Sequence, residues 1–112
     1  MARYLISFPD GAMIFPGEDL PDVDRAAHAV VQQAQNAGVW IFGGGINGHE
    51  VSVVATDGSV TDGRYPDGKE HIGGFAIVDV PAREEALEWA ARFAAACRCA
   101  QEVWEIMDDP SV

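Results

Sequence analysis

Residues 74–97 read GFAIVDVPAREEALEWAARFAAAC, and this stretch decides the fold. Its first seven residues predict a strand, because they are mostly apolar, include β-branched side chains and end at Pro81. A helix is expected over about 82–96, where apolar residues recur on one face and three glutamates lie near the positive N-terminal end. The stretch therefore predicts a strand that leads directly into an amphipathic helix.

The first half of the chain shows the same order of elements. A strand is predicted over 3–8, and the segment 9–21, rich in Gly, Pro and Asp, is expected to be a loop. A helix follows, with Asp22 as its expected N-cap and Gly38 just after its C-terminal end. The wholly apolar run over 39–42 then predicts a short strand that continues into three glycines.

A β-hairpin is predicted between the two halves, because Thr56-Asp57-Gly58 separates two β-prone runs. A last strand is expected over 101–107. The order β-α-β, hairpin, β-α-β resembles the split pattern of ferredoxin-like α+β domains, with both helices on one face of the sheet. At 112 residues, the chain is expected to form one domain that covers 1–112.

The predicted strands carry apolar side chains on both faces of the sheet. Leu5 and Ile6 are adjacent, as are Ile77 and Val78, and adjacent residues of a strand point to opposite faces. Two helices can shield only one face, and a large exposed apolar face is unusual for a monomer. We therefore expect a homodimer whose sheets pack face to face.

The charge balance excludes several classes of partner. Seven Lys or Arg against eighteen Asp or Glu give a formal net charge of −11. A chain of this charge is not expected to bind nucleic acid or an anionic membrane surface. No secretory leader or membrane span is recognisable, and Cys97 and Cys99 are too few and too close together for a disulfide framework. These features favour a cytoplasmic protein.

The segment TDGRYPDGKEHIGGF at 61–75 resembles the signature of YCII-related proteins of the DGPF group. The usual signature is a Thr-Asp-Gly-Pro-Phe run, a polar stretch, Lys-Glu, and then Gly-Gly-aromatic. The matching residues are Thr61, Asp62, Gly63, Lys69, Glu70, Gly73, Gly74 and Phe75, whereas Arg64 and Tyr65 replace the usual Pro-Phe. The resemblance implies a dimeric ferredoxin-like α/β barrel.

The resemblance also implies a candidate site. The wider YCII-related group includes enzymes thought to use a His-Asp pair, among them a dehydrochlorinase that acts on chlorinated hydroxyquinols. Their histidine lies on the first helix in an Arg-x-x-His context, and Arg25-Ala26-Ala27-His28 has that form. His28 is therefore implied as a catalytic acid or base, with Asp62 as its partner.

The residues themselves leave the roles of this pair open. His28 lies just beyond the apolar stripe of its helix, where it is either a half-exposed boundary residue or a general acid or base at a cleft. Asp62 either orients that imidazole or simply forms a turn with Gly63.

The loop over 62–73 holds most of the remaining polar chemistry. Its candidate substrate-binding residues are Arg64, Tyr65, Lys69, Glu70 and His71. Lysine beside a carboxylate and an imidazole suits a phenolic or anionic oxygen, although a solvated loop is the alternative.

No cofactor or metal is expected. The glycines at 43–48 match the letters G-x-G-x-x-G, but a strand pattern follows them, so no helix N-terminus would receive a dinucleotide pyrophosphate. The three histidines and the Cys-x-Cys pair show no recognised metal-ligand spacing.

Three functional hypotheses remain open. The first is a cofactor-independent dimeric enzyme that performs acid-base chemistry, such as elimination, on a small aromatic or phenolic molecule. The second is a non-catalytic dimer that binds a small molecule or another protein. The third treats the polar loop as a solvated connection with no function of its own.

Overall fold

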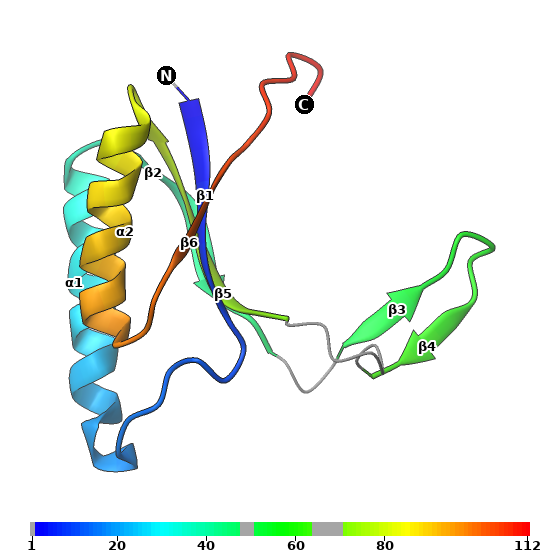
Figure 1. Cartoon of the computed structure of the whole chain (residues 1–112), viewed down its shortest axis with the longest axis horizontal. Helices are drawn as coiled ribbons and strands as arrows, with labels where there is room; N and C mark the ends of the chain where they lie inside the picture. Colours follow the sequence, from blue (N-terminus) through cyan, green and yellow to red (C-terminus); the bar gives the residue numbers. More distant parts are fainter. Residues whose placement is uncertain (1, 48–50, 64–70) are drawn as a thin grey trace.

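The computed structural model describes residues 2–47, 51–63 and 71–112, in which two helices pack on one face of a four-stranded antiparallel sheet (Figure 1). The elements are β1 (Ala2–Pro9), the 3-10 turn η1 (Gly17–Asp19), α1 (Leu20–Asn36), β2 (Trp40–Gly45), β3 (Ser52–Val54), β4 (Val60–Asp62), β5 (Ile72–Val80), α2 (Arg83–Cys97) and β6 (Glu102–Glu105). The sheet has the order β2-β5-β1-β6, and β3 pairs with β4 separately. The predicted ferredoxin-like α+β fold is confirmed.

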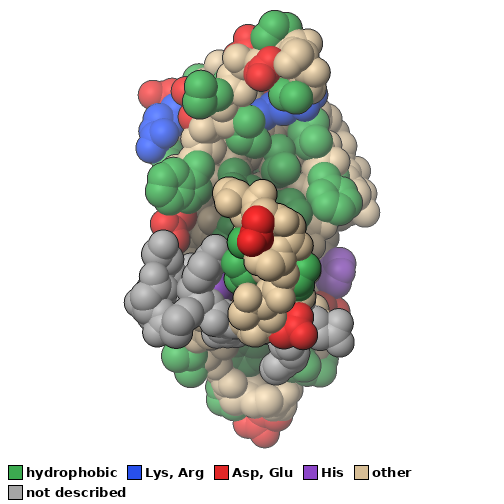
Figure 2. All heavy atoms as spheres, turned by 90° about the vertical axis from the view of Figure 1, so that its right-hand side faces the viewer, with side chains coloured by type: hydrophobic (Ala, Val, Ile, Leu, Met, Phe, Trp, Pro, Cys, Tyr) green, Lys and Arg blue, Asp and Glu red, His purple; other side chains and the backbone are tan. Residues whose placement is uncertain are grey.

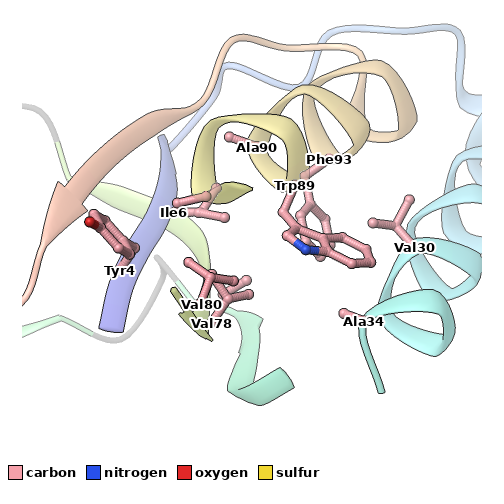
Figure 3. Close-up of a cluster of buried hydrophobic side chains, with 11 residues drawn as sticks. Tyr4, Ile6, Val30, Ala34, Val78, Val80, Trp89, Ala90 and Phe93 are labelled. Carbon is pink, nitrogen blue, oxygen red and sulfur yellow. The ribbon is translucent and has the colours of Figure 1, made fainter. Parts of the chain in front are cut away.

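The hydrophobic core lies between the two helices and the sheet (Figure 3). Along β5 the buried residues alternate with half-buried ones, as expected for a central strand that presents one face to the helices. The side chains that fill this layer come from the two central strands, β1 and β5, and from both helices. They include Ile6, Val30, Ala34, Val78, Val80, Trp89, Ala90 and Phe93. This packing fixes α1 and α2 over the same face of the sheet.

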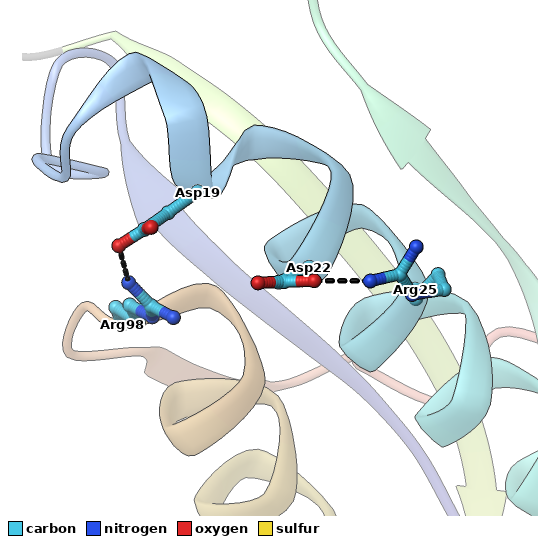
Figure 4. Close-up of polar contacts among 4 residues, drawn as sticks. All are labelled: Asp19, Asp22, Arg25 and Arg98. Carbon is cyan, nitrogen blue, oxygen red and sulfur yellow. Dashed lines mark hydrogen bonds and ion pairs between the residues drawn. The ribbon is translucent and has the colours of Figure 1, made fainter.

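The predicted start of the first helix is wrong by one turn. The N-cap of α1 is Asp19, and Asp22 lies within the first helical turn. Pro21 is accommodated there because the first residues of a helix need no intrahelical N–H donor. Asp22 instead pairs with Arg25, and Asp19 accepts a hydrogen bond of 2.8 Å from Arg98 at the end of α2 (Figure 4).

The predicted ends of the other elements are confirmed within one or two residues, with one exception. Gly38 has φ +74°, which is the left-handed conformation expected just after a helix. The second strand is longer than predicted, because β2 continues through the three glycines to Gly45. Gly43, Gly44 and Gly45 therefore belong to a strand.

The glycines of β2 permit a close approach between backbones. The register between β2 and β5 shifts at 40–42, and Gly43 then pairs with Ala76. A Cβ atom on Gly43 would lie 2.5 Å from the carbonyl oxygen of Phe75 and 2.9 Å from the Cα of Ala76. A Cβ atom on Gly44 would meet nothing within 4 Å.

The predicted β-hairpin is confirmed. Ser52 pairs with Asp62, and Val54 with Val60. In the turn, Gly58 has φ +86°, and the carboxylate of Asp57 accepts a 2.9 Å hydrogen bond from the N–H of Ser59. Hydrogen bonding by the Ser59 side chain, and then by this N–H, lowers the pKa of Asp57. Figure 1 shows the hairpin on the side of the sheet opposite the helices.

The face of the sheet opposite the helices carries a continuous apolar row. Phe42 pairs with Ile77, Ile77 with Leu5, and Leu5 with Trp104, so the row crosses all four strands. Phe42 and Trp104 are 62% and 56% exposed. Figure 2 looks onto this side of the molecule, and hydrophobic side chains gather in the upper part of the view. We call this surface, with Phe42, Ile77, Leu5 and Trp104, the open face.

Among the described helices, none has the length and apolarity required to cross a lipid bilayer.

Replacement of Gly43 by alanine is expected to destabilise the fold. Its methyl group would push against backbone atoms of β5, which cannot move aside as a flexible side chain can, so the free energy of unfolding should fall by about 1–3 kcal/mol. Gly44→Ala is the matched control, expected to change this free energy by less than about 1 kcal/mol. Urea denaturation measures both variants, and equal effects would contradict the close approach.

Candidate active-site cavity

A cavity of about 340 Å³ opens between α1 and the helix-facing side of the sheet, at the end of the core nearest the β2 glycines. Ligand pockets commonly have volumes of about 300–1,000 Å³, so this one suits a single-ring molecule. Its lining is mainly apolar and includes Ile6, Phe8, Met13, Val31, Trp40, Phe75 and Phe93. The polar side chains among the lining residues are Asp24, His28, Cys97 and Gln101.

One wall of the cavity is nearly free of side chains. Gly45 pairs with Gly74 across β2 and β5, and both glycines line the cavity. The Phe8 ring lies against Gly74, where a Cβ atom would be 2.6 Å from it. A Cβ atom on Gly45 would meet nothing within 4 Å, so the space above this glycine is open. The cavity therefore exists because two neighbouring strands lack side chains where larger residues would fill the core.

His28 is one of the residues that line this cavity, and its side chain is 73% exposed. Its Nδ1 atom lies 2.8 Å from the main-chain oxygen of Asp24 and 3.4 Å from the carboxylate of the same residue. Both of these oxygens can only accept hydrogen bonds, so Nδ1 must carry the proton when the ring is neutral. The Nε2 atom is then the unprotonated nitrogen, which is the one able to accept a proton from a ligand.

Asp24 is a site residue that the sequence reasoning missed. It lies one helical turn before His28 and also lines the cavity. The available signal was the spacing, because residues four apart on a helix are neighbours on its surface. The family resemblance pointed instead to Asp62 as the carboxylate partner.

Cys97 and Gln101 complete the polar lining at the end of α2. Burial raises the pKa of the Cys97 thiol, and the neighbouring Cys99 raises it further. This thiol is therefore protonated near neutral pH, which makes it a poor nucleophile and a poor metal ligand. The amide of Gln101 donates a 3.3 Å hydrogen bond to the carbonyl oxygen of Cys99. Across the described segments, no three His, Cys, Asp or Glu side chains come together as metal ligands would.

The other sequence-predicted site residues lie elsewhere. Asp62 ends β4, where its carboxylate accepts a 3.1 Å hydrogen bond from the Ser52 hydroxyl, and it is not among the residues that line the cavity. The two elements that carry His28 and Asp62 lie on opposite sides of the sheet (Figure 1). A single chain therefore does not bring the two residues together.

His71 lines a second, smaller cavity of about 60 Å³ together with Ser7 and Glu102. Its Nε2 atom is buried and has no hydrogen-bond partner within the part of the chain that the structure describes. The remaining predicted substrate-binding residues, Arg64, Tyr65, Lys69 and Glu70, lie outside the described residues.

Comparisons with known proteins agree with the fold and assign a family. The YCII-related domain family matches residues 16–108, which is most of the chain, so the protein belongs to this family. A search of curated proteins found no match.

A similar solved structure is the 5-chloro-2-hydroxyhydroquinone dehydrochlorinase of Burkholderia phenoliruptrix AC1100, in complex with 2,5-dihydroxybenzoquinone. The likeness has a TM-score of 0.52 at 18% sequence identity and covers 97% of each chain. At this identity the comparison supports the fold.

The tautomer of His28 can be measured directly. Long-range proton–nitrogen NMR correlations under alkaline conditions, where the ring is neutral, should show the proton on Nδ1, because Asp24 offers only acceptors to that atom. The His28→Gln variant identifies the signals by their loss. A proton on Nε2 would contradict the arrangement described here.

Proposed function

We propose that this protein is a cofactor-independent enzyme that uses His28 for acid-base chemistry, of the elimination type, on a small aromatic or phenolic molecule. The observation that carries the proposal is an apolar cavity of single-ring size with an oriented imidazole at its mouth. Flat rings suit this cavity because Trp40, Phe93 and a glycine wall offer flat surfaces. The dehydrochlorinase with the same fold acts on a ring of this kind.

In the proposed reaction, the substrate first moves one hydroxyl proton to the ring carbon that bears chlorine, which gives a keto tautomer. His28 then removes a second hydroxyl proton, the electron pair left behind forms a carbon–oxygen double bond, the ring double bonds shift, and the carbon–chlorine bond breaks as chloride leaves. The products are a quinone-like ring, chloride and a protonated His28, which returns its proton to water. The main-chain oxygen and the carboxylate of Asp24, 2.8 Å and 3.4 Å from Nδ1, orient the ring for this step.

Asp62 keeps its proposed role as a second catalytic residue only through a second copy of the chain. Its hairpin lies across the sheet from α1, so a partner subunit would have to receive it (Figure 1). Arg64, Tyr65, Lys69, Glu70 and His71 remain the proposed substrate-binding residues of the polar loop.

A non-catalytic binding protein is the second candidate. The observation that favours it is the largely apolar lining, in which the described residues contribute Asp24, His28 and the protonated thiol of Cys97 as ionisable groups. Such a protein would bind the same rings in the same cavity and would leave them unchanged.

Replacement of His28 by alanine should separate the two candidates. With a chlorinated hydroxyquinol as substrate, chloride release by the wild type should exceed the uncatalysed rate, and the His28→Ala variant should lose at least about 100-fold of this activity. Gln32→Ala is the control, because Gln32 lies one turn further along α1, is exposed and bonds Asn36.

A measurement of ligand binding complements the activity assay. A leucine at position 45 would occupy the cavity, so Gly45→Leu should abolish binding of hydroquinone measured by calorimetry. Binding without chloride release by the wild type would favour the non-catalytic candidate. Unchanged binding in Gly45→Leu would exclude this cavity as the site.

We also propose that the protein is a cytoplasmic homodimer whose subunits cover each other's open face. The apolar row across four strands supports the dimer, because burial of such a surface removes several large side chains from water. The two cysteines are free thiols, as expected in a reducing compartment.

A charge placed on the open face should dissociate this dimer. Phe42→Asp would put a carboxylate beside the Phe75 ring, which lies 5.9 Å from the Phe42 ring. The dimer dissociation constant should rise at least about 10-fold, because the charge would lose its hydration in the contact. Leu87→Asp is the control, because it also replaces an exposed apolar side chain by a carboxylate, but on α2 and away from the open face. Sedimentation equilibrium measures both, and equal effects would count against the open face as the interface.

A further inference from the structure

Within the described residues, the β-hairpin of residues 52–62, which we call the arm, has little packing beyond the pairing of its own two strands. Its strands pair with each other and with no strand of the main sheet. Five of the six strand residues are exposed, and Val53 is half-buried. A two-stranded hairpin on its own is at best marginally stable in water, so the arm is expected to pack against something further.

The two faces of the arm differ in character. Val54 and Val60 pair directly and therefore point to the same face, where they are 65% and 62% exposed. Ser52 and Asp62, two residues away on each strand, share that face. Val53 and Thr61 point to the opposite face, where Val53 is half-buried. The Val54–Val60 face thus carries the two exposed valines of the arm, with a hydrogen-bonded carboxylate at its edge.

The chain exposes more surface than a monomer of its size should. Its accessible area is 7643 Å², whereas a folded monomer of 12.0 kDa is expected to expose roughly 6,000 Å². Its radius of gyration is 15.7 Å, against about 13 Å for a compact domain of this length. The excess, about 1,600 Å² per chain, has the size that each subunit of a permanent homodimer buries.

A second copy of the chain accounts for both unpartnered surfaces at once. The arm and the open face lie on the same side of the sheet (Figures 1 and 2). A two-fold axis on that side would bring each arm to the other subunit and would close the assembly. A different protein would have to supply complements to two unrelated surfaces.

We infer that the arm is a dimerisation element, which packs its Val54–Val60 face on the open-face side of a second copy and receives the other copy's arm in return. The inference rests on the proposed homodimer and adds a second contact to it. Because Asp62 shares the docking face, it would be carried onto the partner subunit, which is the route by which it would join a site there.

Two adjacent residues of the arm provide a matched test. Val60→Lys changes the docking face and should raise the dimer dissociation constant at least about 10-fold, because a lysine there would lose its hydration. Thr61→Lys adds the same charge to the opposite face and should change that constant less than about 3-fold. Sedimentation equilibrium measures both variants, and thermal unfolding checks that the main sheet is intact.

An isotope-filtered NMR experiment tests the contact itself. In a dimer of one labelled and one unlabelled chain, the methyl groups of Val54 and Val60 should show contacts to the unlabelled chain. A dimer that both lysine variants leave intact, or weaken equally, would overturn the arm's role and leave the open-face dimer standing. A wild type that stays monomeric would overturn both proposals.

Discussion

The structure depends on one constraint, which is that a single layer of helices covers a sheet with apolar side chains on both faces. On the covered face, Ile6, Val78 and Val80 pack against Trp89 and Phe93 and form the core. On the other face, the row through Phe42, Ile77, Leu5 and Trp104 has no cover from the described chain. The covered face gives the domain its stability, and the uncovered face supplies the reason for its proposed assembly.

The cavity arises from the same arrangement of layers. Where β2 and β5 meet at Gly45 and Gly74, the sheet has no side chains with which to fill the space below α1. The helix there presents Asp24 and His28 at the opening, so the only described imidazole at the cavity is held by a residue of its own helix. The glycines at one end of β2 and β5 thus leave open the cavity at which the candidate catalytic residue lies.

Much of the fold could be predicted from the sequence because its signals are local. Gly38 ends α1, and Asp57-Gly58 makes the hairpin turn, as the local sequence indicates. The N-cap at Asp22 was wrong, because Pro21 is tolerated inside the first turn and the helix starts at Leu20. The site was harder to predict. The cavity depends on tertiary pairing of Gly45 with Gly74, and the family resemblance drew attention to Asp62 although Asp24 lies beside His28.

The mass of the wild-type protein in solution tests the account most directly. Sedimentation equilibrium at micromolar concentration should give a particle of twice the 12.0 kDa chain mass, because the open face and the arm are covered only in an assembly. A mass of 12.0 kDa at every concentration, with the open face accessible to solvent, would contradict it.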